Sequence, residues 1–144
     1  MNIIDTRDLQ TRLDELEALR DAVTEAETNL QNHVAPAGGE DDTEKEELEE
    51  ALESAQDEFG EDEQRELKEL ENISTSISDF RHGETLIDKD DFEEYAQELA
   101  EDIGAIDRNA SWPLNHIDWT AAASALADDY TEVSYQGTDY YVRA

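Results

Sequence analysis

The sequence predicts a mainly α-helical protein that ends in a small α+β module. Apolar residues recur at helical spacing from residue 6 to about residue 78, and the pattern changes to alternation only near residue 130. All of the Trp and Tyr residues lie after Phe80, so an aromatic core is available only in the second half of the chain. We therefore predict an acidic helical hairpin or coiled coil over residues 1–79 and a compact α+β module over residues 80–144.

The first helix is predicted over residues 6–31. An apolar stripe runs along it at heptad spacing, with further apolar residues beside it: Leu9, Leu16, Val23 and Leu30, then Leu13, Leu19 and Ala26. Asp5 or Thr6 is the expected N-cap. The segment QNHVAPAGG begins at Gln31 and contains Pro36 and a pair of glycines, so we predict that the helix ends there and that a linker spans residues 31–42.

A second helical run covers residues 43 to about 78, as one long helix or as two with a break at Gly60. Thr43 and Glu46 have the spacing of a capping box at its start. Its apolar face carries Leu48, Leu52, Ala55, Phe59, Leu67, Leu70, Ile73 and Ile77. An isolated helix has nothing to cover its apolar stripe. The two runs therefore either pair as an antiparallel hairpin within one chain or associate between chains as a homodimer.

Two short helices are predicted to open the C-terminal module. Asp90 and Glu93 bracket the start of one helix, which stops at Gly104. Its buried face is expected to consist of Phe92, Tyr95, Ala96, Leu99 and Ile103. Asp118 is the expected N-cap of the other helix, which extends to about Asp128 and turns Trp119, Ala122, Ala123 and Leu126 inward.

The end of the chain predicts a β-hairpin. YTEVSY and TDYYV are separated by Gln136-Gly137, which suits a two-residue turn. In this register Val133 faces Tyr140 and Thr131 faces Val142. A lone hairpin is only marginally stable in water, so we expect this aromatic and β-branched face to pack on the two preceding helices.

The stretch FRHGET, residues 80–85, contains the Arg-His-Gly opening of the histidine-phosphatase signature. Phosphoryl transfer would need a second His and further Arg residues around the phosphate, and only His116, Arg108 and Arg143 remain for this. The strongly negative chain would also repel an anionic substrate. We therefore interpret His82 and Gly83 as a turn.

Other ligand and membrane signals are absent from the sequence. Asp88, Asp90 and Asp91 fail the EF-hand spacing, because Phe92, Glu93 and Leu99 occupy positions that need ligands or Gly. The chain contains no Cys and no apolar run near 18 residues. We expect no catalytic, cofactor or metal site, no specific role for His33, and a cytoplasmic protein.

The net charge is the dominant property of the sequence. There are 41 acidic and 10 basic side chains, a formal charge of −31, which disfavours direct binding to nucleic acid or to an anionic membrane. Residues 43–71 contain 14 acidic and 3 basic residues, a net −11 over 29 residues. In a helix this is one net charge per about 4 Å, against one per about 3.4 Å on a DNA strand. The leading hypothesis is therefore a non-catalytic DNA mimic that occupies the basic groove of a DNA-binding protein.

The C-terminal module also resembles a known family. FEEYAQELAEDIG from Phe92, WPLNHIDW from Trp112 and AAASALADDYTEVSYQGTDYYVR from Ala121 are similar to the closing region of ArdA-type antirestriction proteins. Residues 1–79 do not resemble that family's earlier domains. The resemblance implies a phage or plasmid protein that imitates DNA and inhibits a type I restriction-modification enzyme of a bacterial host.

The candidate partner-binding residues are carboxylates that act collectively. The charge density selects the arm residues Glu46, Glu47, Glu50, Glu53, Asp57, Glu58, Glu61 and Asp62. The resemblance implies the module residues Glu93, Glu94, Glu98, Glu101, Asp102, Asp128 and Asp129.

Two alternative functions remain open. The chain could be an acidic coiled-coil adaptor or assembly protein that contacts a partner helix through the stripe at Leu9, Leu16, Val23 and Leu30. It could also be a halophilic protein whose acidity serves hydration. Disruption of the stripe would abolish adaptor binding, neutralisation of carboxylates would weaken a mimic, and loss of helicity at low salt would indicate salt adaptation.

Overall fold

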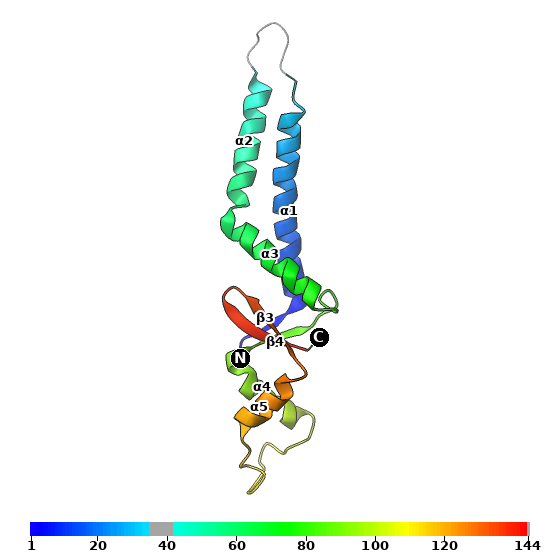
Figure 1. Cartoon of the computed structure of the whole chain (residues 1–144), viewed down its shortest axis with the longest axis vertical. Helices are drawn as coiled ribbons and strands as arrows, with labels where there is room; N and C mark the ends of the chain where they lie inside the picture. The colour runs from blue at the N-terminus through cyan, green and yellow to red at the C-terminus, as the bar shows by residue number, and fades with distance from the viewer. Residues whose placement is uncertain (35–41, 144) are drawn as a thin grey trace. The chain divides into compact units, whose positions relative to one another are not determined.

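The chain is mainly α-helical with a small α+β module, as the sequence predicts, and the sheet of this module has four antiparallel strands (Figure 1). A computed structural model describes residues 1–34 and 42–143 and divides the chain into two compact units. Unit 1 comprises Met1–Gln10 and Asn72–Ala144, and unit 2 comprises Thr11–Glu71. Unit 1 thus includes residues 1–10 and 72–79, which the sequence pattern placed in the arm.

Three helices contribute to unit 2: α1 (Thr6–Gln31), α2 (Thr43–Glu58) and α3 (Glu61–Ser76). The second helical run is therefore broken in two, and the break falls at the predicted Gly60. The buried side chains of unit 2 come from α1 and α3: Leu13, Leu16, Ala26, Leu67 and Leu70. In α2 the stripe residues Leu48, Leu52 and Ala55 are half-buried. The buried residues of α1 and α3 fit a hairpin within one chain, and the homodimer stays a prediction.

Ion pairs connect α1 to α3 inside unit 2. Nη2 of Arg12 lies 3.0 Å from Oε2 of Glu66, and Nη1 of Arg20 lies 3.1 Å from Oε1 of Glu71. The pKa of Arg12 is raised, chiefly by its hydrogen bonds to Glu66. Nε of Arg12 also donates to Oε1 of Glu66 at 3.0 Å, so this contact is bidentate, which suits the planar fork of donors on a guanidinium.

The starts of the first two helices follow their caps. Asp5 caps α1, as predicted, because its Oδ1 accepts a hydrogen bond of 2.8 Å from the backbone N–H of Arg7. The predicted capping box at Thr43 is wrong, because Asp42 is the N-cap of α2 and accepts from the backbone N–H of Lys45 at 3.0 Å. Helix α1 ends at Gln31, and the predicted helix stop at residues 36–39 lies outside the described residues.

The sheet of unit 1 contains β1 (Ile3–Asp5), β2 (Thr85–Asp88), β3 (Thr131–Tyr135) and β4 (Thr138–Val142) in the order β1-β2-β4-β3. The β3–β4 hairpin has the predicted register, with Val133 opposite Tyr140 and Thr131 opposite Val142. Its turn residues Gln136 and Gly137 have φ values of 52° and 78°, as a two-residue turn with a matching twist requires.

The first two strands were not predicted. They contain three and four residues, and they pair Ile3 with Ile87 and Asp5 with Thr85, about 80 positions apart. Asn2 extends this contact, because its carbonyl accepts from the backbone N–H of Asp88 at 2.9 Å. The pairing places the start of the chain in unit 1.

The helices of unit 1 are α4 (Phe92–Asp102), preceded by the 3-10 turn η1 (Lys89–Asp91), and α5 (Trp119–Ala127). Asp118 caps α5 as predicted and accepts from the backbone N–H of Ala121 at 3.1 Å. Helix α4 begins at Phe92, between Asp90 and Glu93 as predicted, and Asp88 caps the preceding 3-10 turn by accepting from the backbone N–H of Asp90. The predicted burial of Ile103 is wrong: it is 70% exposed, since α4 ends at Asp102.

The helices pack on the opposite face of the hairpin from the one predicted. The ring centroids of Phe92 on α4 and Tyr141 on β4 are 4.7 Å apart, with the planes nearly perpendicular. Tyr140 and Val133 lie on the other face and are also buried. Adjacent residues of a strand point to opposite faces, so the Tyr140-Tyr141 pair contributes to both sides of the sheet.

FRHGET forms the turn between α3 and β2, as predicted. The backbone N–H groups of His82 and Gly83 donate to the carbonyl of Asp79 at 3.0 and 3.2 Å. Gly83 has a φ of 103°, and a Cβ there would lie 2.9 Å from Nε of Arg7, so only Gly fits. Both Arg81 and His82 are exposed to solvent.

Candidate functional site

The charge of the protein is concentrated on particular helices. Helix α2 carries eight acidic residues and one basic residue, a net −7 over 16 residues. At a rise of 1.5 Å per residue this is one net charge per about 3.4 Å, the spacing along one DNA strand. By the same arithmetic α1 and α3, each with a net −4 over 26 and 16 residues, have one charge per about 10 and 6 Å.

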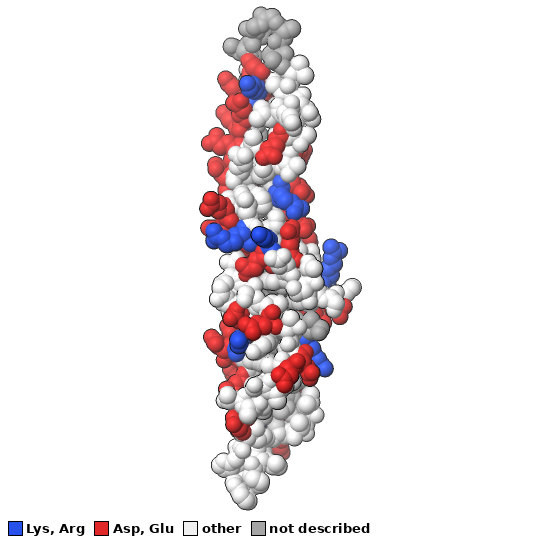
Figure 2. Space-filling view, in the orientation of Figure 1, with Lys and Arg blue, Asp and Glu red and all other residues white. Residues whose placement is uncertain are grey.

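The carboxylates of α2 form one continuous acidic face. At about 100° per residue, the six predicted site residues on this helix span an arc of roughly 140°, opposite the half-buried Leu48, Leu52 and Ala55. Figure 2 shows acidic side chains in a column along α2. The six residues, all exposed, are Glu46, Glu47, Glu50, Glu53, Asp57 and Glu58.

These six carboxylates have no hydrogen-bond or ion-pair partner among the described residues of the chain. The arginines of α1 have other partners: Arg12 and Arg20 pair with Glu66 and Glu71 on α3, and Arg7 pairs with Asp5. Helix α2 also buries none of its residues completely. Its acidic face is therefore available to an external cationic partner.

The predicted site residues that follow α2 lie on α3. Glu61 and Asp62 begin this helix and are exposed. Asp62 is partly neutralised, because its Oδ1 lies 3.6 Å from Nη1 of Arg65. An exposed pair of this kind contributes little to stability, so the carboxylate stays open to competition.

Helix α4 repeats the same charge spacing in unit 1. It carries five acidic residues and no basic residue over 11 residues, one charge per about 3.3 Å. Glu94, Glu98 and Asp102 are exposed. Glu101 differs, because its Oε2 pairs with Nε of Arg108 at 3.3 Å and the side chain is only 16% exposed.

Three predicted module residues remain, Glu93, Asp128 and Asp129. Glu93 and Asp128 line a pocket between α4, α5 and β4. Glu93 accepts a hydrogen bond from the hydroxyl of Thr120 at 3.1 Å, and this contact joins α4 to α5. Asp128 and Asp129 directly follow α5 and are exposed. The module residues selected by the resemblance therefore lie on α4 and directly after α5.

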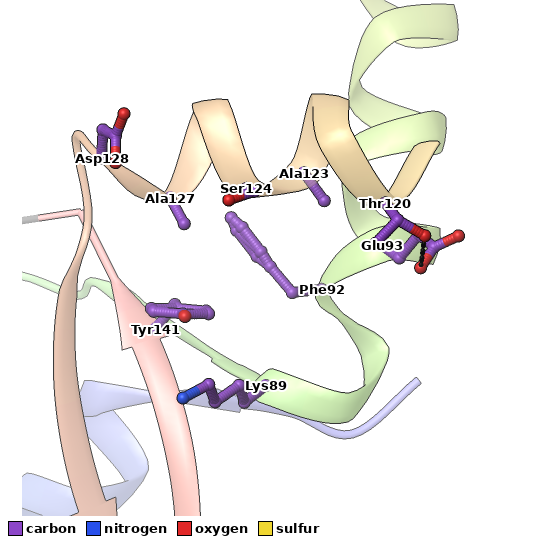
Figure 3. Close-up of a pocket in the computed structure, with 9 residues that line it drawn as sticks. All are labelled: Lys89, Phe92, Glu93, Thr120, Ala123, Ser124, Ala127, Asp128 and Tyr141. Carbon is purple, nitrogen blue, oxygen red and sulfur yellow. Dashed lines mark hydrogen bonds between the residues drawn. The ribbon is translucent and has the colours of Figure 1, made fainter. Parts of the chain in front are cut away.

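A pocket of about 390 Å³ lies between α4, α5 and β4 (Figure 3). Phe92 and Tyr141 point into it, and Lys89 lies at its edge. Nζ of Lys89 is 3.4 Å from Oε2 of Glu132, and the charge of Glu132 raises the pKa of Lys89. The lining contains neither His nor Cys, so its hydroxyl groups, on Thr120, Ser124 and Tyr141, have no imidazole base within the pocket.

The described residues contain neither a cluster of metal ligands nor a membrane-spanning helix. Among residues 1–34 and 42–143, no three His, Asp or Glu side chains lie close enough together to hold a metal ion. No helix in that part of the chain has the length and hydropathy of a membrane span.

Sequence reasoning missed a contact at the ends of α1 and α2. The expectation that His33 has no specific role is wrong, because its Nε2 lies 2.9 and 3.0 Å from the carboxylate oxygens of Asp42. The His33 side chain is only 8% exposed. Spacing gave no signal for this contact, because nine positions separate the two residues and neither lies within a helix.

Comparisons of the chain with protein-family models, curated proteins and solved structures found no match. The resemblance to ArdA-type proteins therefore stays a prediction from residues 92–143. The charge spacing of α2 and α4 does not depend on that resemblance.

Proposed function

We propose that this protein is a non-catalytic DNA mimic that binds and inhibits a DNA-binding host-defence enzyme of the restriction-modification type. It would act in the cytoplasm of a bacterial host, through carboxylates rather than through a catalytic site. The observation that carries the proposal is the charge spacing of α2, one net charge per about 3.4 Å, on an acidic face that has no partner among residues 1–34 and 42–143.

A DNA-binding groove recognises phosphates largely through Lys and Arg, with little dependence on sequence. A helix that presents carboxylates at the phosphate spacing offers such a groove the same pattern of negative charge. Glu and Asp also accept bidentate hydrogen bonds from Arg, as phosphate does. The acidic α4 would supply a second segment of this kind.

The packing of the apolar stripe supports the charge-based function over the adaptor alternative. Leu16 at the centre of the stripe is fully buried within the chain, at 0% exposure. A partner helix could reach it only if α1 separated from α3 and broke the Arg12–Glu66 ion pair. The carboxylates of α2 require no such opening.

The direct test is competition for a defined enzyme. The purified methyltransferase core of a type I restriction-modification enzyme would be loaded with fluorescein-labelled duplex DNA, and the protein would be titrated into the complex. We expect a saturable fall in anisotropy as the duplex is released. A triple amide variant of α2, Glu47→Gln, Glu50→Gln and Asp57→Asn, should release the DNA only at higher concentration.

The matched control removes the same number of charges from α1, by Glu17→Gln, Glu25→Gln and Glu27→Gln. Gln has nearly the helix propensity of Glu, so both variants should keep their helicity. Failure of the wild-type protein to displace the duplex would refute the proposal for this enzyme class. Equal effects of the two triple variants would show that only total charge matters.

A further inference from the structure

The loop between α4 and α5 carries the most exposed large apolar side chains of unit 1. Trp112 is 76% exposed, Leu114 is 62% exposed, and Ile103 at the start of the loop is 70% exposed. Ile117 is also an exposed large hydrophobic residue. We call these four residues the apolar loop. Large apolar patches on soluble surfaces mark interaction sites, whereas single exposed residues need no explanation.

The segment that carries Trp112, Leu114 and Ile117 is also uncharged, which is unusual in this chain. Residues 109–117 contain no Asp, Glu, Lys or Arg, although 35% of the whole sequence is charged. Figure 2 shows that the end of unit 1 formed by this loop is almost free of acidic and basic side chains. Asp102, Asp107 and Asp118 flank the uncharged segment, and Arg108, which directly precedes it, pairs with Glu101 at 3.3 Å.

Hydrogen-bonded turns hold the loop in its conformation. The backbone N–H of Leu114 donates to the carbonyl of Ser111 at 2.9 Å, and that of His116 donates to Pro113 at 3.0 Å. Asp107 orders the first turn by accepting from the backbone N–H of Asn109 at 3.0 Å. An ordered loop loses little conformational entropy on binding, which favours its use as a contact surface.

We propose that the apolar loop anchors the protein to its target, in an apolar recess of a DNA-binding protein that is bordered by Lys and Arg. This inference rests on the proposed function and identifies its second contact element. Trp is enriched among the residues that dominate binding energy, and such residues are typically surrounded by polar contacts that exclude water. Here the flanking Asp102, Asp107 and Asp118 would meet the basic border.

Size and charge favour this partner over a second copy of the chain. A stable symmetric dimer uses about 20–30 residues on each side, far more than four apolar side chains provide. A larger self-contact would bring like carboxylates together between two molecules of charge −31. A basic partner turns the same carboxylates into favourable contacts.

The test measures affinity and the environment of Trp112 in one titration. The probe is again the methyltransferase core of a type I restriction-modification enzyme. Trp112→Ser and Leu114→Ser should each lower affinity by about 30-fold or more, the factor that corresponds to a hot-spot residue. Val34→Ser is the matched control, because Val34 is 83% exposed on unit 2 and should have no effect.

Fluorescence provides an independent readout. In a Trp119→Phe background Trp112 is the sole Trp, so its emission should shift to the blue on binding and resist quenching by acrylamide. The Trp112→Ser variant should keep the salt dependence of the wild type, because it removes no charge. If Trp119→Phe fails to fold, the affinities of the Ser variants in the native background decide the matter.

Three outcomes would overturn the inference. Wild-type affinity in Trp112→Ser, with unchanged salt dependence, would refute the anchor while leaving the DNA mimic intact. Self-association of the wild type that Trp112→Ser abolishes would identify the patch as a contact between copies of the chain. Absence of any binding by the wild-type protein would refute the proposed function, and the anchor with it.

Discussion

The charge spacing of α2 predicts a specific dependence of binding on salt. A polyanion with the charge spacing of a single nucleic acid strand releases about 0.7 counterions for each charge that its partner neutralises. Helix α2 has a net charge of −7, so its neutralisation should give a slope of about −5 in a plot of log K against log salt concentration. Between 50 and 200 mM salt, affinity should then fall about 1,000-fold.

The triple amide variant of α2 reduces the negative charge of the helix from −7 to −4. The same calculation then gives a slope of about −3 and a loss of only about 50-fold over this salt range. The variant should bind more weakly than the wild type at 50 mM salt, and the difference should narrow as salt rises. The reason is that both proteins lose their electrostatic term when counterions screen the charges.

The assay is fluorescence anisotropy of the labelled protein, titrated with the methyltransferase core at several salt concentrations. The triple variant of α1 is the control, because its charges lie on a helix with one net charge per about 10 Å. Its slope should stay close to that of the wild type. A wild-type slope near zero, or an equal loss of slope in both variants, would refute the assignment of the site to α2.

Three further predictions concern stability. Leu70→Ala should lower the unfolding free energy of unit 2 by about 2–5 kcal/mol, because Leu70 is fully buried. Thermal unfolding followed by circular dichroism should show a smaller loss for Leu48→Ala, because Leu48 is only half-buried. Equal losses in the two variants would contradict this packing. Desolvation raises the pKa of Asp42, but hydrogen bonds from His33 and the Lys45 backbone outweigh it and leave the pKa below its usual 3.8. The stability difference between wild type and Asp42→Asn should therefore persist above pH 3.8 and vanish as pH falls through the lower folded pKa, and a pH-independent difference would exclude this linkage. Burial, with a hydrogen bond to Tyr95, raises the pKa of Tyr130 from 10 to about 12. The contribution of Tyr130 to stability should therefore be present below pH 10 and be lost between pH 10 and 12. An absorbance titration of the wild type, compared with Tyr130→Phe, would contradict this prediction if Tyr130 showed a midpoint near 10.

Local physical rules account for what the sequence predicted correctly. The break at Gly60, the cap at Asp118 and the register from Val133 to Tyr140 depend on residues a few positions apart. The charge spacing of α2 is likewise local, because a helix converts a count of charges directly into a length. These features would persist under many tertiary arrangements. The sequence by itself therefore determined the acidic face of α2 and the β3–β4 hairpin.

The tertiary structure decided the features that join distant residues. Strand β1 forms only because Ile3 reaches Ile87, and a three-residue strand has too short a pattern to be recognised by itself. The burial of His33 against Asp42 and the exposure of Trp112 also depend on which surfaces the rest of the chain covers. Pairing between distant residues is settled by competition among all the surfaces that could bury the same side chains, and that competition is resolved only by the folded chain.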